Sequence, residues 1–160
     1  MLIRSYVQSD LPRLTELTIE TFGPFYEDSF RPLVGELIFA NQHGNWRDDY
    51  RKQVLGLHDP DDHKCVVVAE EDGVLAGYVA WAVKPDRRKG TVTILAVAAE
   101  HRRGSLGTEL CEHAFDEMRT EGAEFVEIGT GGDDFHAPAR AFYESLGCIK
   151  LPLAVYFRTL

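Results

Sequence analysis

Residues 94–110 read ILAVAAEHRRGSLGTEL, which combines an apolar strand pattern, a short basic turn and the start of an amphipathic helix. This order places the first N–H groups of a helix, which have no acceptor within the helix, beside Arg102 and Arg103. A helix N-terminus favours anions because its free donors and its dipole both attract negative charge. The stretch therefore predicts a binding site for a specific anion such as a phosphate group.

The composition is that of one globular domain over residues 1–160, with 44% hydrophobic residues and a net charge of -9. This charge argues against nucleic-acid binding and is compatible with a cationic substrate, although it also suits solubility alone. Cys65, Cys111 and Cys148 have neither disulfide nor metal spacing, so we expect apolar core thiols and no metal. The chain shows no signal pattern and no membrane-length apolar run, which predicts a cytoplasmic protein with no membrane partner.

The apolar pattern predicts a mixed α/β fold with a mostly antiparallel, twisted sheet of about six to seven strands flanked by about four helices. The expected strands cover residues 2–7, 64–70, 74–83, 91–97, 124–130 and, in one or two pieces, 149–160. One expected helix starts after Asp10, one or two follow at roughly 32–40 and 46–57, and two more cover 106–118 and 138–146. Gly77, inside the second strand of a predicted hairpin, indicates a bulge or a close approach.

Two stretches resemble the signatures of the GNAT superfamily of N-acetyltransferases. The first signature, Leu-x-Val-x-Pro-x-x-Arg-Gly-x-Gly-x-Gly, aligns with residues 95–107, and the second, Ala-x-x-Leu-Tyr-x-x-x-Gly-Phe, aligns with residues 139–148. The chain departs from the first signature at Ala99, where proline is common, and at Arg103 and Ser105, where glycine is common. His136 stands where the second signature often has asparagine. We expect a slightly shifted turn from these replacements.

The resemblance implies acetyl-coenzyme A as co-substrate, held in a wedge between the fourth and fifth strands. The backbone of Leu95 and Val97 would pair with the pantetheine amides, and the basic turn would hold the pyrophosphate. The implied cofactor-binding residues are Leu95, Ala96, Val97, Arg102, Arg103, Gly104, Ser105, Leu106, Gly107, Thr108 and His136.

Acetyl transfer to an amine requires that the acceptor ammonium loses a proton and that the departing thiolate gains one. The resemblance implies that Tyr143 donates the proton to the sulfur, although the residue also suits core packing. The base stays open among Glu127 on the fifth strand and Asp133, Asp134 and His136 after it, with Glu127 and Asp133 as the catalytic candidates. Two aspartates after two glycines are equally typical of an ordinary turn.

The segment between the first two strands usually shapes the acceptor pocket in this superfamily. Here it mixes aromatic and acidic residues, which suits a cationic ligand and equally suits packing between helices. The candidate substrate-binding residues are Phe25, Glu27, Asp28, Trp46 and Asp134.

Together these features predict an acetyl-CoA-dependent N-acetyltransferase acting on a small cationic amine such as an aminoglycoside, another amino sugar or a polyamine. Two alternatives stay open. One is a protein or peptide acetyltransferase, although Thr91 replaces the glutamate of histone-type members; the other is a non-catalytic coenzyme A binding module. A Rossmann methyltransferase is excluded, because too little chain follows the glycine motif at 129–132. An exposed last strand around 155–157 would allow a homodimer.

Overall fold

The computed structural model describes residues 1–160, which divide into two compact units. The first unit comprises Met1–Thr21 and Arg47–Ile128, and the second comprises Phe22–Trp46 and Gly129–Leu160. The first unit holds the sheet and the basic turn, whereas the second holds the aromatic and acidic segment and the second signature. The assignment of the chain to a single domain stays a prediction.

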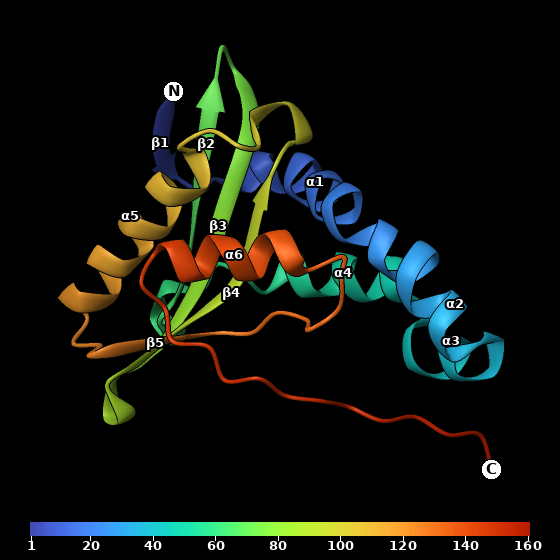
Figure 1. The fold of residues 1–160 in the computed structure, drawn as a ribbon. Helices are drawn as coiled ribbons and strands as arrows, with labels where there is room; N and C mark the ends of the chain where they lie inside the picture. Colours follow the sequence, from blue (N-terminus) through green and yellow to red (C-terminus); the bar gives the residue numbers. More distant parts are fainter. The chain divides into compact units, whose positions relative to one another are not determined.

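The sheet of the first unit has five strands in the order β1-β2-β3-β4-β5 (Figure 1). They are β1 (Leu2–Ser5), β2 (Lys64–Glu71), β3 (Val74–Lys84), β4 (Lys89–Val97) and β5 (Phe125–Ile128). Consecutive strands pair antiparallel except β4 and β5, which are parallel, so the sheet is mixed and mostly antiparallel as predicted. The predicted number of about six to seven strands is wrong, because residues 149–160 form no strand.

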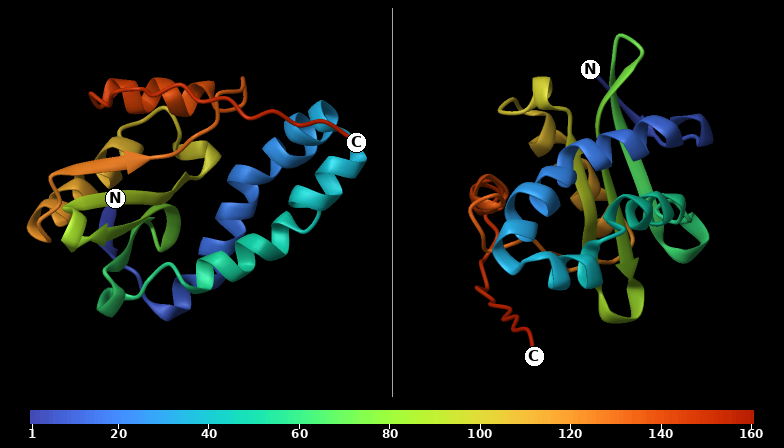
Figure 2. Two further views of the ribbon diagram at one scale, coloured as in Figure 1. Left: turned by 90° about the horizontal axis from the view of Figure 1, so that it is seen from below. Right: turned by 90° about the vertical axis from the view of Figure 1, so that its right-hand side faces the viewer.

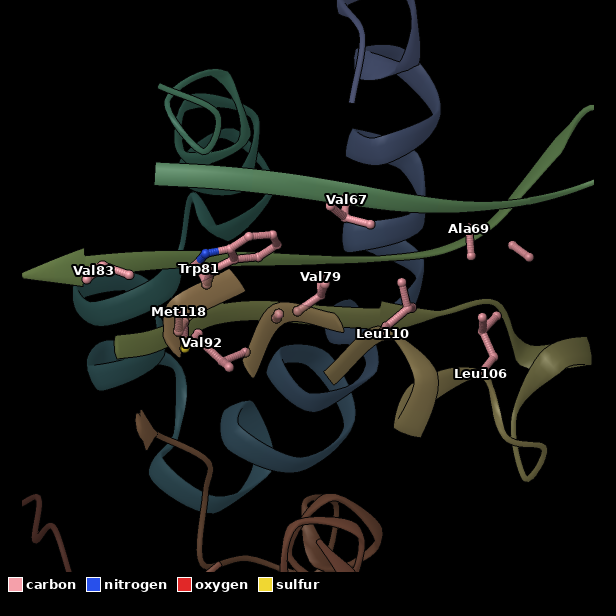
Figure 3. Packing of buried hydrophobic residues seen from close by; sticks show 11 residues of the cluster. Val67, Ala69, Val79, Trp81, Val83, Val92, Leu106, Leu110 and Met118 are labelled. Carbon is pink, nitrogen blue, oxygen red and sulfur yellow. The ribbon is translucent and has the colours of Figure 1, made fainter. Parts of the chain in front are cut away.

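Helix α5 (Leu106–Thr120) covers one face of this sheet, as Figure 3 shows. Its predicted apolar stripe is buried, with Leu110 and Ala114 at 0% exposure and Met118 at 2%. The stripe packs on side chains that alternate along the central strands, among them Val79 and Trp81. Packing against three strands fixes the position of α5 and therefore the position of the basic turn that precedes this helix.

The first residues of helix α1 (Leu11–Pro24) belong to the first unit and pack on the other face of the sheet. Leu14 and Leu17 are buried there at 0% and 1% exposure. The hydroxyl of Thr18 contacts that of Tyr78 on β3, which points away from the α5 side because neighbouring strand residues alternate. The sheet is thus covered by helical residues on both faces.

The β2–β3 hairpin is built as the sequence predicts. Its turn places Asp72 at φ 51° and Gly73 at φ 79°, the conformation of a two-residue hairpin loop. The register shifts between Ala69 and Glu70, so one extra β3 residue lies beside Gly77 as a bulge. A Cβ at Gly77 would lie 3.0 Å from the carbonyl oxygen of Ala96, so the close approach is also confirmed.

The helical part of the second unit is more broken than the sequence indicates. After the end of α1 comes a π-helical turn at Phe25–Phe30, then the one-turn helix α2 (Arg31–Val34) and helix α3 (Glu36–His43). The break falls at Gly35, whose φ of 82° a helix cannot continue. Helix α4 (Trp46–Leu55) starts at the end of this segment and continues in the first unit. Four helices have nine or more residues: α1, α4, α5 and α6 (Ala137–Ser145).

The C-terminal residues 149–160 run as an extended chain without a strand partner (Figure 2). The predicted closing strand is therefore wrong. Pro152 cannot donate a backbone hydrogen bond, and no sheet edge within the second unit is available to pair with the segment. Its large apolar side chains are exposed, including Ile149 at 99% and Leu153 at 81%.

Candidate functional site

Strand β4 leads into the basic turn, and only part of its outer edge is paired. The parallel ladder with β5 extends from the pair Lys89–Phe125 to the pair Val92–Ile128. From Thr93 onward β4 continues without a neighbour on that side, because β5 ends at Ile128 and not at 130 as predicted. The pairing therefore stops where the predicted wedge begins.

A β-bulge sets the orientation of the unpaired part of β4. Ala80 of β3 pairs with Ile94, whereas the next residue, Trp81, pairs with Val92, so Thr93 is an extra residue in β4. A single inserted residue reverses which side chains face α5 and which backbone groups face outward beyond it.

Backbone hydrogen bonds show which groups this edge presents. The N–H of Ala98 donates to the carbonyl oxygen of Ala76 in the β3 segment, so Ala98 faces β3. Backbone groups alternate along a strand, which turns those of Leu95 and Val97 away from β3. Ala96, also a cofactor-binding candidate, faces β3 and is 1% exposed. The two outward residues are the two for which the sequence predicts pairing with an extended amide chain.

Arg103 has the least favourable backbone conformation in the turn between β4 and α5. Its φ of 66° lies in the left-handed region, which disfavours residues other than glycine by roughly 1–2 kcal/mol. The GNAT signature has glycine at this place, so the turn keeps the glycine conformation with an arginine in it. Ser105, the other replaced glycine, has φ −80° and needs no glycine.

A hollow of about 290 Å³ lies at the start of α5. The Nε of Arg102 donates to the carbonyl oxygen of Val97 at 2.8 Å, which holds that guanidinium at the end of β4. The Ser105 hydroxyl donates to the carboxylate of Glu109 and makes no helix cap, so no side chain caps the first N–H groups of α5. The hollow is lined by Met1, Glu100, His101, Arg102, Gly104, Ser105, Leu106 and Glu109.

In the second unit, the loop before α6 holds a histidine–aspartate pair. The Nδ1 of His136 lies 2.5 Å from Oδ1 of Asp133, and Oδ2 of Asp133 accepts the N–H of Phe135 at 3.2 Å. The Nη1 of Arg140 donates to the carbonyl oxygens of Gly131 and Asp133, both at 2.7 Å. The loop is therefore held by side chains from its own helix.

Phe25 joins the aromatic segment to this pair. Its ring centroid lies 4.7 Å from that of His136 and 5.8 Å from that of Phe135. The structure thus brings together one residue predicted to bind substrate, Phe25, one predicted to bind cofactor, His136, and one predicted to be catalytic, Asp133.

The other substrate-binding candidates lie in different surroundings. Trp46 is 3% exposed, and its Nε1 donates to Glu27 at 3.1 Å while its ring stacks on Tyr26. Glu27 also accepts from Arg31 at 2.9 Å, so its carboxylate is engaged in packing the helical segment. Asp28 and Asp134 are exposed.

Glu127 and Tyr143 are the remaining catalytic candidates. Glu127 is exposed on β5, and its carboxylate lies 3.0 Å from Nζ of Lys89 on β4. Tyr143 is half-buried on α6, with its ring 5.3 Å from that of Phe142.

Sequence reasoning placed Gly131 in the loop before the aspartates but missed its close packing and the role of Arg140. A Cβ on Gly131 would lie 2.4 Å from both Oδ1 of Asp133 and Nδ1 of His136, so the pair closes directly over this residue. The signal was available in the paired glycines before the aspartates, whereas nothing local indicated where Arg140 would reach.

The three cysteines lie at buried or half-buried positions. Cys111 is buried, and burial raises the pKa of the half-buried Cys65 and Cys148 thiols, which keeps them protonated and unreactive. The structure contains no group of three or more metal-ligating side chains. None of its helices has the length and apolar character needed to cross a bilayer.

Comparisons with known proteins agree with the signatures. The model of the "Acetyltransferase (GNAT) family" matches residues 12–148. No curated protein matches the chain.

The solved structures include many with the same fold. A mutant of the BH1408 protein from Bacillus halodurans superposes with a TM-score of 0.72 at 18% identity, covering 100% of both chains. The aminoglycoside 6'-N-acetyltransferase AAC(6')-IG from Acinetobacter haemolyticus gives a TM-score of 0.69 at 15% identity, covering 100% of this chain and 99% of that one. AAC(6')-Iy with a bisubstrate analogue of CoA and acetylneamine gives 0.69 at 13% identity, covering 99% and 97%. Identities this low establish a common fold only.

Proposed function

Because the chain belongs to the acetyltransferase (GNAT) family, we propose that it transfers the acetyl group of acetyl-coenzyme A to a primary amine of a small cationic acceptor. The observation that carries this proposal is the outer edge of β4 beyond Val92, which is unpaired and leads, through a turn with two arginines, to an uncapped helix N-terminus. An extended amide chain ending in a diphosphate matches such a surface along its whole length.

The cofactor is proposed to lie along this edge. The outward backbone groups of Leu95 and the N–H of Val97, whose carbonyl oxygen accepts from Arg102, pair with the pantetheine amides, as an added strand would. The first N–H groups of α5 and the guanidinium of Arg103 hold the pyrophosphate, with Arg102 fixed beside it by its bond to Val97. A solved structure of the same fold, AAC(6')-Iy, carries a CoA analogue, which supports the choice of cofactor.

The acceptor is proposed to be a small polyamine-like or amino-sugar molecule, with an aminoglycoside as the leading candidate. The net charge of -9 attracts cations, and Asp28 and Asp134 are exposed acids available to bind ammonium groups. Several solved structures of this fold are aminoglycoside acetyltransferases. Trp46 is not part of this proposal, because its ring is buried.

A protein-lysine acceptor and a non-catalytic coenzyme A module are the competing functions. Thr91 takes the place of the glutamate that would favour the former, and the exposed acids favour a compact cation over a peptide. An activity assay distinguishes the coenzyme A module from an acetyltransferase, because a binding module releases no free thiol from acetyl-coenzyme A.

We propose in addition that the chain forms a homodimer through residues 149–160. Apolar side chains occupy alternate positions of this segment, as in a strand with one apolar face: Ile149, Leu151, Leu153, Val155 and Phe157. Phe157 packs on the ring of Phe30, but the other four side chains are exposed and no strand of this chain pairs with the segment, so a second copy of the chain is the partner proposed to bury them.

The test is release of free thiol from acetyl-coenzyme A in the presence of single amines. We expect aminoglycosides or polyamines to be acetylated and histone-type peptides to be left unchanged, with the product confirmed by a mass increase of one acetyl group. Turnover of peptides alone would exclude the small-molecule acceptor. Saturable binding of acetyl-coenzyme A without turnover of any amine would identify a binding module.

A further inference from the structure

We propose that His136, oriented by Asp133, is the general base that takes the proton from the acceptor ammonium. This assignment rests on the proposed acetyltransferase function and decides among the candidates that the sequence leaves open. It also gives His136 a role on the acceptor side, in place of the cofactor contact implied by its position in the second signature.

The hydrogen bonds of the pair leave one ring nitrogen available. Both carboxylate oxygens of Asp133 are engaged, Oδ1 by Nδ1 of His136 and Oδ2 by the N–H of Phe135. A carboxylate only accepts hydrogen bonds, so Nδ1 carries the hydrogen and Nε2 of the neutral ring carries the lone pair. Nε2 is therefore the atom that can accept a proton from the substrate.

The surrounding loop holds the pair in a fixed position. Arg140 donates to the carbonyl oxygens of Gly131 and Asp133, which ties the middle of the loop to α6. Only glycine fits at 131, since a Cβ there would overlap Asp133 and His136. A base that is already oriented before the substrate arrives loses little free energy in reaching the reactive geometry.

The environment of the imidazole suits an amine acceptor. Its side chain is 18% exposed, so it is sheltered but reachable, and the rings of Phe25 and Phe135 lie 4.7 and 5.0 Å from it. The charged groups around it are Asp133, which faces the positive charge that the ring acquires, and Arg140, whose guanidinium is directed to backbone oxygens. Asp134, next in the chain, is exposed and available to bind a cationic acceptor.

The chemistry of proton transfer favours imidazole over the rival carboxylates. Proton transfer from a lysine-like amine is unfavourable by about 10⁴-fold to an ordinary imidazole and by about 10⁶-fold to an ordinary carboxylate. Glu127 is in addition ion-paired with Lys89, and the carboxylate of Asp133 is already occupied by His136.

The complete step is balanced as follows. The acceptor ammonium gives one proton to Nε2 of His136, and the nitrogen lone pair attacks the carbonyl carbon of the acetyl thioester. The C–S bond breaks, and the sulfur leaves with its electron pair and takes the hydroxyl proton of Tyr143. The new amide nitrogen gives up its second proton, which returns through water to the Tyr143 oxygen, and His136 releases its proton to solvent. The products are the amide, coenzyme A thiol and one proton.

The experiment compares the pH dependence of turnover in wild type and His136→Gln. We expect kcat at neutral pH to fall by about 10²–10⁴-fold with the KM for acetyl-coenzyme A unchanged. The difference in kcat between wild type and His136→Gln should shrink as the pH rises toward the pKa of the amine, because the free amine then needs no base. Asp133→Asn should give a smaller loss with the same trend. The matched control His113→Gln, on α5, should behave as wild type.

A second substitution protects against a folding defect, since His136 is the residue before the first turn of α6. His136→Asn supplies a side chain preferred at helix N-caps and should keep the melting temperature of wild type, yet it should show the same pH-dependent loss. Two results would overturn the assignment: an unchanged pH profile in either folded variant, or a loss confined to the KM for acetyl-coenzyme A. If wild type acetylates no amine at any pH, the proposed function itself fails, which is a distinct outcome.

Discussion

The hydroxyl oxygen of Tyr78 lies 2.5 Å from that of Thr18, and both side chains are fully buried between β3 and α1. The Thr18 hydroxyl has one hydrogen, which it donates to the carbonyl oxygen of Leu14 at 2.7 Å. Tyr78 must therefore be the donor to Thr18. Burial raises the pKa of Tyr78 far above its usual value, so the phenol stays protonated and keeps donating.

With Tyr78 as the donor, removing Thr18 or Tyr78 should have unequal effects on the free energy of unfolding. Thr18→Val leaves the buried phenol without an acceptor and should lower the free energy of unfolding by about 1–3 kcal/mol, whereas Tyr78→Phe leaves Thr18 satisfied and should cost less, about 0.5–1.5 kcal/mol. Urea unfolding measures both, and the double variant should resemble Tyr78→Phe more than the sum. Equal single effects that add in the double variant would show that the donor was assigned wrongly.

A second prediction concerns stability at low pH. Two hydrogen bonds from the Arg4 guanidinium hold the pKa of Asp10 below its usual value, aided by the N–H of Val7. A carboxyl whose pKa is lowered by folding stabilises the protein above its unfolded pKa, near 3.9, and loses that contribution as the pH falls below it. Asp10→Asn should therefore be less stable at pH 7, by about 1–3 kcal/mol, and should approach wild type at pH 2–3.

Thermal unfolding across pH 2–7 checks this prediction. Asp48→Asn is the matched control, because Asp48 pairs with Arg51 on the exposed side of α4 and should change little at any pH. A stability difference between wild type and Asp10→Asn that persists undiminished at pH 2 would contradict the linkage.

Local patterns predicted the parts of the fold that depend on local chemistry. The buried stripe of α5 and the hairpin at Gly73 follow from spacing and turn residues alone. The end of β5 at Ile128 did not, because an apolar pattern does not show how far two strands stay paired; the pairing with β4 stops at Val92, just before the β4 bulge at Thr93. Residues 149–160 have a strand-like pattern yet pair with no strand, because such a pattern does not specify a pairing partner.

In the candidate site, too, local features were predicted from the sequence and contacts between distant segments were not. The turn at Arg103 was predicted from its own residues, while the contact between Phe25 and His136 joins segments more than a hundred residues apart. Long-range packing of this kind also placed Trp46 in the interior, where its aromatic and acidic neighbours had indicated a ligand pocket.

A third prediction separates the two roles of Arg103, backbone conformation and charge. Arg103→Gly relieves the left-handed backbone and should raise the free energy of unfolding by up to about 1–2 kcal/mol, whereas Arg103→Val keeps this backbone cost and should give no such gain. If the guanidinium holds the pyrophosphate, the Kd for acetyl-coenzyme A should rise by about 10-fold or more in both variants. Calorimetry provides the affinities, and unchanged binding in Arg103→Gly would remove this side chain from the cofactor site.

A fourth prediction follows from the exposed C-terminal segment. Replacing Leu153 and Val155, exposed at 81% and 77%, by lysine should convert a homodimer to a monomer without lowering the melting temperature of a single copy. Sedimentation velocity at several protein concentrations measures the change. The control replaces Lys150 and Arg158, outside the apolar positions, by glutamine and should leave the dimer intact. A wild-type chain that is monomeric at all concentrations would exclude the dimer.

The last prediction concerns the leaving group. The sulfur of coenzyme A leaves more readily when it is protonated as the C–S bond breaks. A phenol that donates to this sulfur therefore lowers the barrier without adding to cofactor binding. Tyr143→Phe should therefore lower kcat by about 10²-fold and leave the Kd for acetyl-coenzyme A within about two-fold of wild type. Tyr6→Phe, in the first unit beside His58, is the matched control and should keep full activity. Stopped-flow thiol detection separates acetyl transfer from product release; a Tyr143→Phe enzyme with an unchanged transfer rate would mean that solvent, and not this residue, protonates the sulfur.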